Sequence, residues 1–229
     1  MTRAFLTAIA AVVALGTAGV AVAGGSDAAC QAVQSVSTHR LVSIPWTKVQ
    51  PTAAVAMAGS VGSKVRVKIY ETLTQDASWR FHNNVLPQLI KTYGAAAGFE
   101  IYLHPSADFR NVLASQLVGC AAAAQRLDVM NALFKAMADG TLPHDDANTP
   151  EACGSYYDKL YALAQHALPM SEAKFAQCMI AHDGLVHQDA VAKMSYNDGV
   201  RRNPAIFVNG QVAYDYDVGA VSRRIDAVR

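Results

Sequence analysis

The stretch Asn203-Pro204-Ala205-Ile206-Phe207-Val208-Asn209-Gly210 decides the fold. A residue–proline step leads into four apolar residues, and the Asn-Gly pair that follows them is a strong signal for a two-residue hairpin turn. The sequence therefore predicts a strand over 205–208 that pairs with a second strand over 211–214. The bond before a proline adopts the cis form at a cost of only about 0.5–1 kcal/mol, so local packing can hold a loop in that form.

Upstream, the sequence predicts a strand, a helix and a second strand in succession. Residues 65–70 alternate apolar and polar side chains, residues 78–93 have helical apolar spacing, and residues 99–103 alternate again. Pro87 lies inside the predicted helix and is expected to kink it, because proline removes a backbone donor and clashes with the preceding turn. This order is typical of a βαβ unit.

A predicted helical block separates this unit from the hairpin. Apolar residues step by threes and fours without a break over 113–137, and further helices are predicted over 156–168, from Ser171 onward, and from an N-cap at Asp183 to Asn197. After the hairpin, Asp217 is placed to cap a last helix. The order βαβ, helical block, ββα predicts an α/β fold.

With this order, residues 62–229 resemble DsbA-like thioredoxin-fold proteins, the thiol:disulfide interchange family. The motifs that carry the resemblance are Phe81-His82-x-x-Val85-Leu86-Pro87, the helix with Cys120 and Phe134, the segment Phe175-x-x-Cys178, and the stretch at 203–210. The resemblance implies a thioredoxin-like domain over 62–112 and 199–229, with a helical insertion over 113–198. Residues 24–61 are expected to form an N-terminal arm.

The resemblance also implies a cis bond before Pro204, opposite a redox-active Cys-x-x-Cys. At the matching positions this chain has Gln75, Asp76, Ala77 and Ser78. The family needs a thiol there because a helix N-terminus stabilises the thiolate and lowers its pKa. With no thiol, these four residues are a degenerate active site, and no catalytic residue is predicted.

Two neighbouring side chains, Ser78 and His82, are candidates to replace the thiols. Ser78 is a nucleophile only beside an activating base, and His82, one helical turn on, is the candidate. We interpret His82 as structural and Asp76 as a cap or dipole partner of the helix.

The first 23 residues read as a secretory signal: Arg3, then an apolar run over 4–20, then the cleavage motif Ala21-Val22-Ala23. Of the 19 basic and 18 acidic residues in the chain, the signal contains only Arg3, so the mature chain is balanced in charge. That balance argues against nucleic-acid binding, which needs a clustered basic excess. We expect an exported, periplasmic protein with no membrane segment once the signal is removed.

Four cysteines in an exported chain indicate disulfides, and spacing alone leaves three pairings open. The resemblance implies a Cys120–Cys178 bridge in the insertion, which leaves Cys30–Cys153 as a second bridge. No metal or cofactor is predicted, because His182 and His187, a pair with helical spacing, have no suitable third ligand nearby.

Four functions remain open at this stage. The favoured hypothesis is a redox-inactive protein that binds an extended peptide or an envelope protein, with Asn203 and Pro204 as the binding loop, by a form of strand addition. The second is a thiol:disulfide oxidoreductase that uses Cys30 or Cys153, which would have to be exposed and near Pro204. The third is a different enzyme that uses Ser78, as kappa-type glutathione transferases use a serine near this turn. The fourth is a structural part of a secretion or surface assembly.

Overall fold

The computed structural model describes residues 26–31, 55–106, 108–144, 149–180 and 182–229, with the side chains of residues 182–187 left out of the description. The predicted signal and most of the predicted N-terminal arm lie outside these ranges. No helix in the described ranges is long and apolar enough to cross a membrane.

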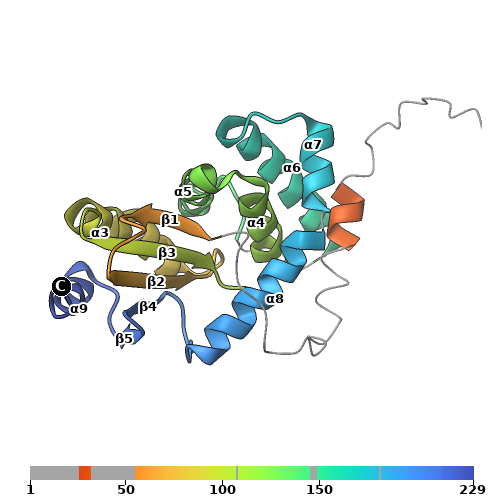
Figure 1. Ribbon diagram of the computed structural model, residues 1–229. Coiled ribbons are helices and arrows are strands. Elements are labelled where there is room, and N and C mark those ends of the chain that lie inside the picture. The colour runs from red at the N-terminus through yellow and green to blue at the C-terminus, as the bar shows by residue number, and fades with distance from the viewer. Residues whose placement is uncertain (1–25, 32–54, 107, 145–148, 181) are drawn as a thin grey trace, which may run out of the picture.

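One mixed sheet holds the strands of the described residues, in the order β1-β3-β2-β4-β5 (Figure 1). The strands are β1 (Ala56–Gly59), β2 (Val65–Glu71), β3 (Ala97–Leu103), β4 (Ala205–Val208) and β5 (Gln211–Ala213). β2 and β3 are parallel, whereas β4 pairs antiparallel with both β2 and β5. The four predicted strands are confirmed, with ends that shift by one or two residues.

β1 was not predicted, because it falls in the segment expected to be an arm. Its sequence, Ala-Met-Ala-Gly, has little strand propensity, and it is held by antiparallel pairing with β3. Gly59 ends β1 with a φ of 69°, and a Cβ at this position would lie 2.4 Å from the Ala97 carbonyl oxygen. The close approach of the two backbones therefore requires glycine at residue 59.

The helical run after β2 differs from the expected kinked helix. It consists of α2 (Asp76–Arg80), a π-helical segment (Phe81–Val85) and α3 (Leu86–Tyr93). Pro87 is the second residue of α3 and comes directly after the π-helical segment, where it cannot donate the next helical hydrogen bond. Pro87 lies inside one continuous helical run, as predicted, and the irregularity takes the form of the π-helical segment directly before it.

The helical insertion contains α4 (Phe109–Cys120), a 3₁₀ turn (Ala123–Gln125), α5 (Arg126–Ala138), α6 (Pro150–Ala167), α7 (Glu172–Met179) and α8 (His182–Asn197). The unbroken helix predicted over 113–137 was wrong, since Ala121 is extended and the 3₁₀ turn follows it. Asp183 lies inside α8 and does not precede it. Ser171 and Asp217 cap α7 and α9 (Val218–Asp226) through their side chains, as predicted.

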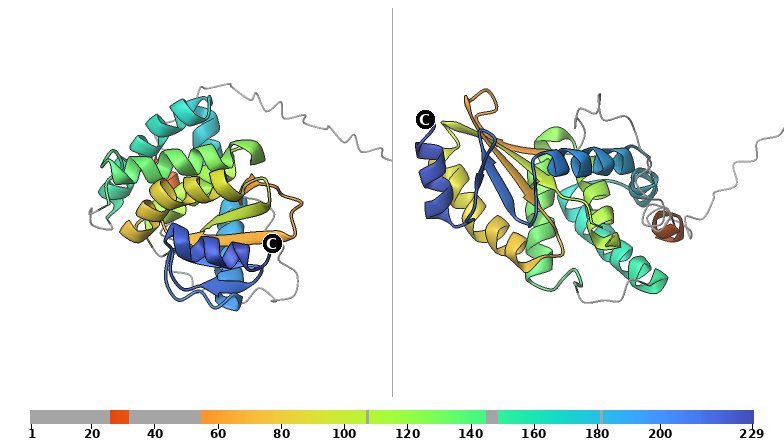
Figure 2. Two further views of the ribbon diagram at one scale, coloured as in Figure 1. Left: turned by 90° about the vertical axis from the view of Figure 1, so that its left-hand side faces the viewer. Right: turned by 90° about the horizontal axis from the view of Figure 1, so that it is seen from below.

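The two faces of the sheet are buried by different helices. Val67, Ile69 and Ile206 pack in the large core that also contains residues of α3 and α9. On the opposite face, Tyr70, Tyr102 and Phe207 form a smaller core with Val191 of α8. Figure 2 shows α3 and α9 together on one side of the sheet. The second face is thus covered in part by α8.

Candidate functional site

Gln75, Asp76, Ala77 and Ser78, the four positions expected to match the cysteine motif, lie at the N-cap and in the first turn of α2. Gln75 is the N-cap residue of α2, although its side chain makes no capping hydrogen bond. Gln75 and Asp76 are exposed, Ala77 is half-buried and Ser78 is fully buried. Asp76 is the first helical residue and pairs with Arg80 at 3.7 Å. Of these four side chains, only Gln75, Asp76 and Ala77 can meet a ligand from solution.

Ser78 serves the turn itself. Its Oγ accepts a hydrogen bond from the backbone N–H of Thr72 at 3.2 Å, and its side chain has no exposed surface. The indole N–H of Trp79 donates to the Leu73 carbonyl oxygen, which fixes the same turn from the other side. These two bonds satisfy buried backbone groups that lie outside the strand ladder. Ser78 therefore has a structural task.

The ring nitrogens of His82 form hydrogen bonds with residues other than Ser78. Its Nδ1 lies 2.7 Å from Glu71 Oε2, its Nε2 lies 2.9 Å from Asn131 Oδ1, and its ring stacks on Phe134 with centroids 4.1 Å apart. Glu71 is fully buried and His82 is 1% exposed. Since both ring nitrogens already have partners, His82 offers Ser78 no base. The geometry does not support an enzyme that uses Ser78.

The Asn203–Pro204 loop lies against the same turn. The peptide bond between the two residues is cis, and Asn203 Nδ2 donates to Thr72 Oγ1 at 2.6 Å. Thr72 in turn is bonded through its carbonyl oxygen to the N–H of Gln75, at 3.2 Å. Asn203 is therefore two hydrogen bonds from Gln75. The expected juxtaposition of the loop and the helix start is present.

His104 orients the Asn203 amide. Ser195 Oγ donates its only proton to the Ala192 carbonyl oxygen, so it must accept from His104 Nε2, 2.9 Å away. His104 Nδ1 is then left as an acceptor, and Asn203 Nδ2 lies 3.3 Å from it. Burial lowers the pKa of His104, because it disfavours the charged imidazolium. A neutral His104 with its proton on Nε2 therefore keeps the amide nitrogen of Asn203 pointing inward.

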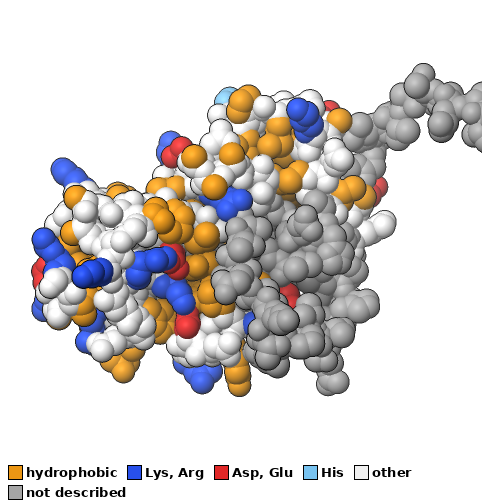
Figure 3. Space-filling model, in the orientation of Figure 1, with side chains coloured by type: hydrophobic (Ala, Val, Ile, Leu, Met, Phe, Trp, Pro, Cys, Tyr) orange, Lys and Arg blue, Asp and Glu red, His pale blue; other side chains and the backbone are white. Residues whose placement is uncertain are grey.

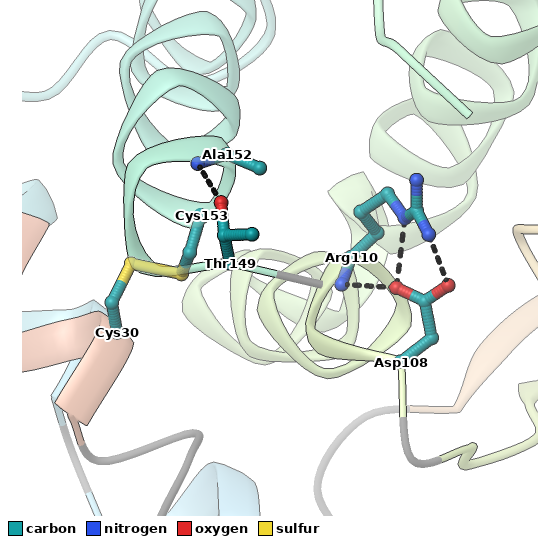
Figure 4. The surroundings of a disulfide bond; sticks show 6 residues. All are labelled: Cys30, Asp108, Arg110, Thr149, Ala152 and Cys153. Carbon is teal, nitrogen blue, oxygen red and sulfur yellow. Dashed lines mark hydrogen bonds and ion pairs between the residues drawn. A yellow bond between two sulfur atoms is a disulfide. The ribbon is translucent and has the colours of Figure 1, made fainter. Parts of the chain in front are cut away.

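All four cysteines form disulfides within the helical part of the molecule. Cys120 of α4 pairs with Cys178 of α7, and Cys30 pairs with Cys153 of α6, with Cα–Cα distances of 5.9 and 6.0 Å. Both expected pairings are confirmed. Figure 4 shows Cys30, in the helix at residues 26–31, joined to the first turn of α6 next to its cap Thr149. Cys30 and Cys153 are 4% and 2% exposed, so neither has the exposure that a reactive thiol requires.

Among the described residues, no cluster of three histidine, cysteine or carboxylate side chains could hold a metal ion. The side chains of His182 and His187 lie outside the description. Sequence reasoning missed Glu71, Thr72 and His104 as parts of the site. The available signal was weak: each is a polar residue at or just beyond the end of a strand of the βαβ unit.

No protein-family model matches the chain, and no curated protein matches its sequence. Solved structures do match. A protein-disulfide isomerase from Novosphingobium aromaticivorans has a TM-score of 0.63 at 15% identity, over 76% of this chain and 97% of that one. BdbD from Bacillus subtilis has a TM-score of 0.63 at 14% identity, over 76% and 91%. Wolbachia pipientis alpha-DsbA1 has a TM-score of 0.62 at 17% identity, over 80% and 93%.

The TM-scores establish the fold of this chain, whereas identities of 14–17% say nothing about its chemistry. These similarities cover 76–80% of this chain and 91–97% of the neighbours. The chain has the DsbA-like thioredoxin fold.

Proposed function

We propose that this chain is an exported DsbA-like protein without thiol chemistry, which binds an extended peptide or an envelope protein between the start of α2 and the Asn203–Pro204 loop. The proposal rests on the first and last of the four positions expected to match the cysteine motif, Gln75 and Ser78. Gln75 is exposed at the helix start but has no ionisable group, and Ser78 is buried and bonded to Thr72. The scaffold keeps the surface that faces a ligand and lacks the nucleophile.

Backbone groups in the loop support peptide binding. Within the described residues, the backbone N–H and C=O of Asn203 make no hydrogen bond to another backbone group. β4 begins two residues later, at Ala205, so these backbone groups lie next to the end of a strand. An extended peptide can pair with such groups in the manner of an added strand.

The cysteines favour this proposal over the oxidoreductase alternative. That alternative needs an exposed cysteine beside Pro204, whereas Cys30 and Cys153 are buried and joined to each other. Two disulfides also suit an oxidising compartment, which agrees with the predicted signal and supports export.

Site-specific photo-crosslinking in cells tests peptide binding. Gln75→p-benzoylphenylalanine places a reactive group at the proposed groove, and Lys159→p-benzoylphenylalanine places the same group on an exposed position of α6. We expect crosslinks to envelope proteins from residue 75 that are absent from residue 159. Equal crosslinking from both positions, or none from residue 75, would argue against the proposal.

A further inference from the structure

A pocket lies on the sheet face opposite α3 and α9, beside the loop that contains Pro204. It has a volume of about 440 Å³ and is enclosed by the segment 198–202, the loop and the β4–β5 hairpin. This volume falls in the range of small-molecule and side-chain sites, about 300–1,000 Å³. Pro204 forms part of its wall, so the pocket adjoins the proposed peptide groove. We call it the arginine pocket, after Arg201 and Arg202.

The floor of the arginine pocket is apolar. Ala205 and Phe207 are 8% and 7% exposed, and Val200 and Val212 pack against the same small core. Tyr214, 71% exposed, lies at the rim. An aliphatic or aromatic side chain that entered this space would lose apolar contact with water, which is favourable at about 25 cal/mol per Å².

The rim of the pocket carries unbalanced positive charge. Arg201 and Arg202 are exposed, and neither guanidinium meets a carboxylate within the described part of the chain. Asp198, the acidic residue of the lining, is already bonded to Lys68 Nζ at 2.8 Å and to the Tyr70 hydroxyl at 2.6 Å. Its charge is therefore largely offset, and an incoming carboxylate meets two arginines. Figure 3 shows basic side chains gathered over the part of the molecule that contains the strands and α9.

Two backbone acceptors at the β5 edge already have side-chain donors. Arg202 donates to the Tyr214 carbonyl oxygen, and Arg224 Nη2 donates to the Val212 carbonyl oxygen at 3.4 Å. Guanidinium groups thus occupy acceptors along and just beyond β5, a way of protecting an edge strand from pairing. A peptide bound at the Pro204 loop could place a side chain in the pocket without pairing with this edge, because Pro204 is part of the pocket wall.

From these observations we infer that the arginine pocket selects the bound segment: it takes an apolar side chain whose neighbours in the peptide are acidic. This inference rests on the proposed function and deepens it, because it names the chemistry of the peptide. Arg201 and Arg202 would bind the flanking carboxylates by charge-assisted hydrogen bonds, and Phe207 and Val212 would contact the apolar side chain.

Fluorescence anisotropy with two labelled nonapeptides tests the inference on the mature chain. One peptide has a central leucine flanked by glutamates, and its matched control has lysines in place of the glutamates. We expect the acidic peptide to bind at least about ten-fold more tightly, with a preference that weakens as salt is added. Arg201→Ala should weaken binding about three-fold, and Arg201→Ala with Arg202→Ala about ten-fold.

Arg223→Ala is the matched control variant, since it removes an exposed arginine from α9, on the other face of the sheet. Its affinity should equal that of the wild type. Val212→Ser removes apolar floor and should also weaken binding, with circular dichroism as the check on folding. If Val212→Ser unfolds, Val200→Ser tests the same apolar floor.

The outcomes separate the two proposals. Equal affinity for both peptides, or unchanged affinity in Arg201→Ala, overturns the inference that the arginine pocket selects the peptide. In that case, crosslinks from residue 75 would still support a peptide-binding groove. Absence of both peptide binding and crosslinks overturns the inference and the proposed function together.

Discussion

Removing one partner of the buried pair Glu71 and His82 should cost several kcal/mol of folding free energy. Their 2.7 Å contact is made with 0% and 1% side-chain exposure, so neither group can exchange this hydrogen bond for one to water. Breaking a buried pair by removal of one partner costs about 3–5 kcal/mol, because the remaining polar group stays buried without compensation. Glu71→Ala is therefore expected to lower the free energy of unfolding by about 3 kcal/mol or more. A domain with a total stability of about 5–15 kcal/mol would lose a large fraction of it.

Urea unfolding followed by circular dichroism measures this effect. Glu71→Gln keeps the shape and one acceptor for His82, and it should cost about 1–2 kcal/mol. The double variant Glu71→Leu with His82→Leu removes both polar groups, so its loss should be smaller than the sum of the two single losses.

The exposed pair of Asp76 and Arg80, in the same helical run, is the internal control. Its side chains are 67% and 77% exposed and 3.7 Å apart, so Asp76→Ala should cost no more than about 0.5 kcal/mol. A loss for Glu71→Ala that is as small as the loss for Asp76→Ala would refute the reasoning.

Three further predictions concern the disulfides, pH and the turn. Cys120→Ser with Cys178→Ser opens a loop with a sequence separation of 58, and should lower the free energy of unfolding by about 2–4 kcal/mol in denaturant titration. Burial holds the pKa of His104 below its ordinary 6.5, so the unfolded chain binds the proton more readily than the folded chain. The free energy of unfolding should therefore fall as pH drops through 6.5, and His104→Gln should flatten this dependence between pH 7 and pH 5. An unchanged pH dependence in the variant would contradict the prediction. Ser78→Ala leaves the Thr72 N–H buried without its acceptor and should cost about 1–3 kcal/mol, seen as a lower melting temperature; no change would mean that the turn does not need the bond.

Local patterns predicted most of the fold. Alternation located β2 and β3, and the Asn-Gly turn located the β4–β5 hairpin. β1 was missed because its alanines and glycine have no pattern, and its pairing partner Ala97–Leu103 lies about 40 residues away in the sequence. The break at Ala121 was missed because apolar spacing continues through it, and Gly119, the one break signal nearby, lies inside α4 and not at its end.

The polar side of the candidate site was harder to predict. Sequence analysis singled out His82 and Asn203, but it could not identify the residues that they contact. Glu71 precedes His82 by 11 residues, and the residue that Asn203 contacts through its amide, Thr72, is 131 residues away. Such contacts arise from tertiary packing, and periodicity carries no information about them.

Thiol exchange activity tests the central claim most directly. The account predicts that the purified mature chain neither reduces insulin nor oxidises a reduced peptide above background, because the exposed Gln75 offers no thiolate and Ser78 is buried. It also predicts that Gln75→Cys with Ser78→Cys gains activity, since the new thiol at residue 75 lies at the start of the helical run from Asp76 to Tyr93. Wild-type turnover that is abolished by Cys30→Ser or Cys153→Ser would contradict the account.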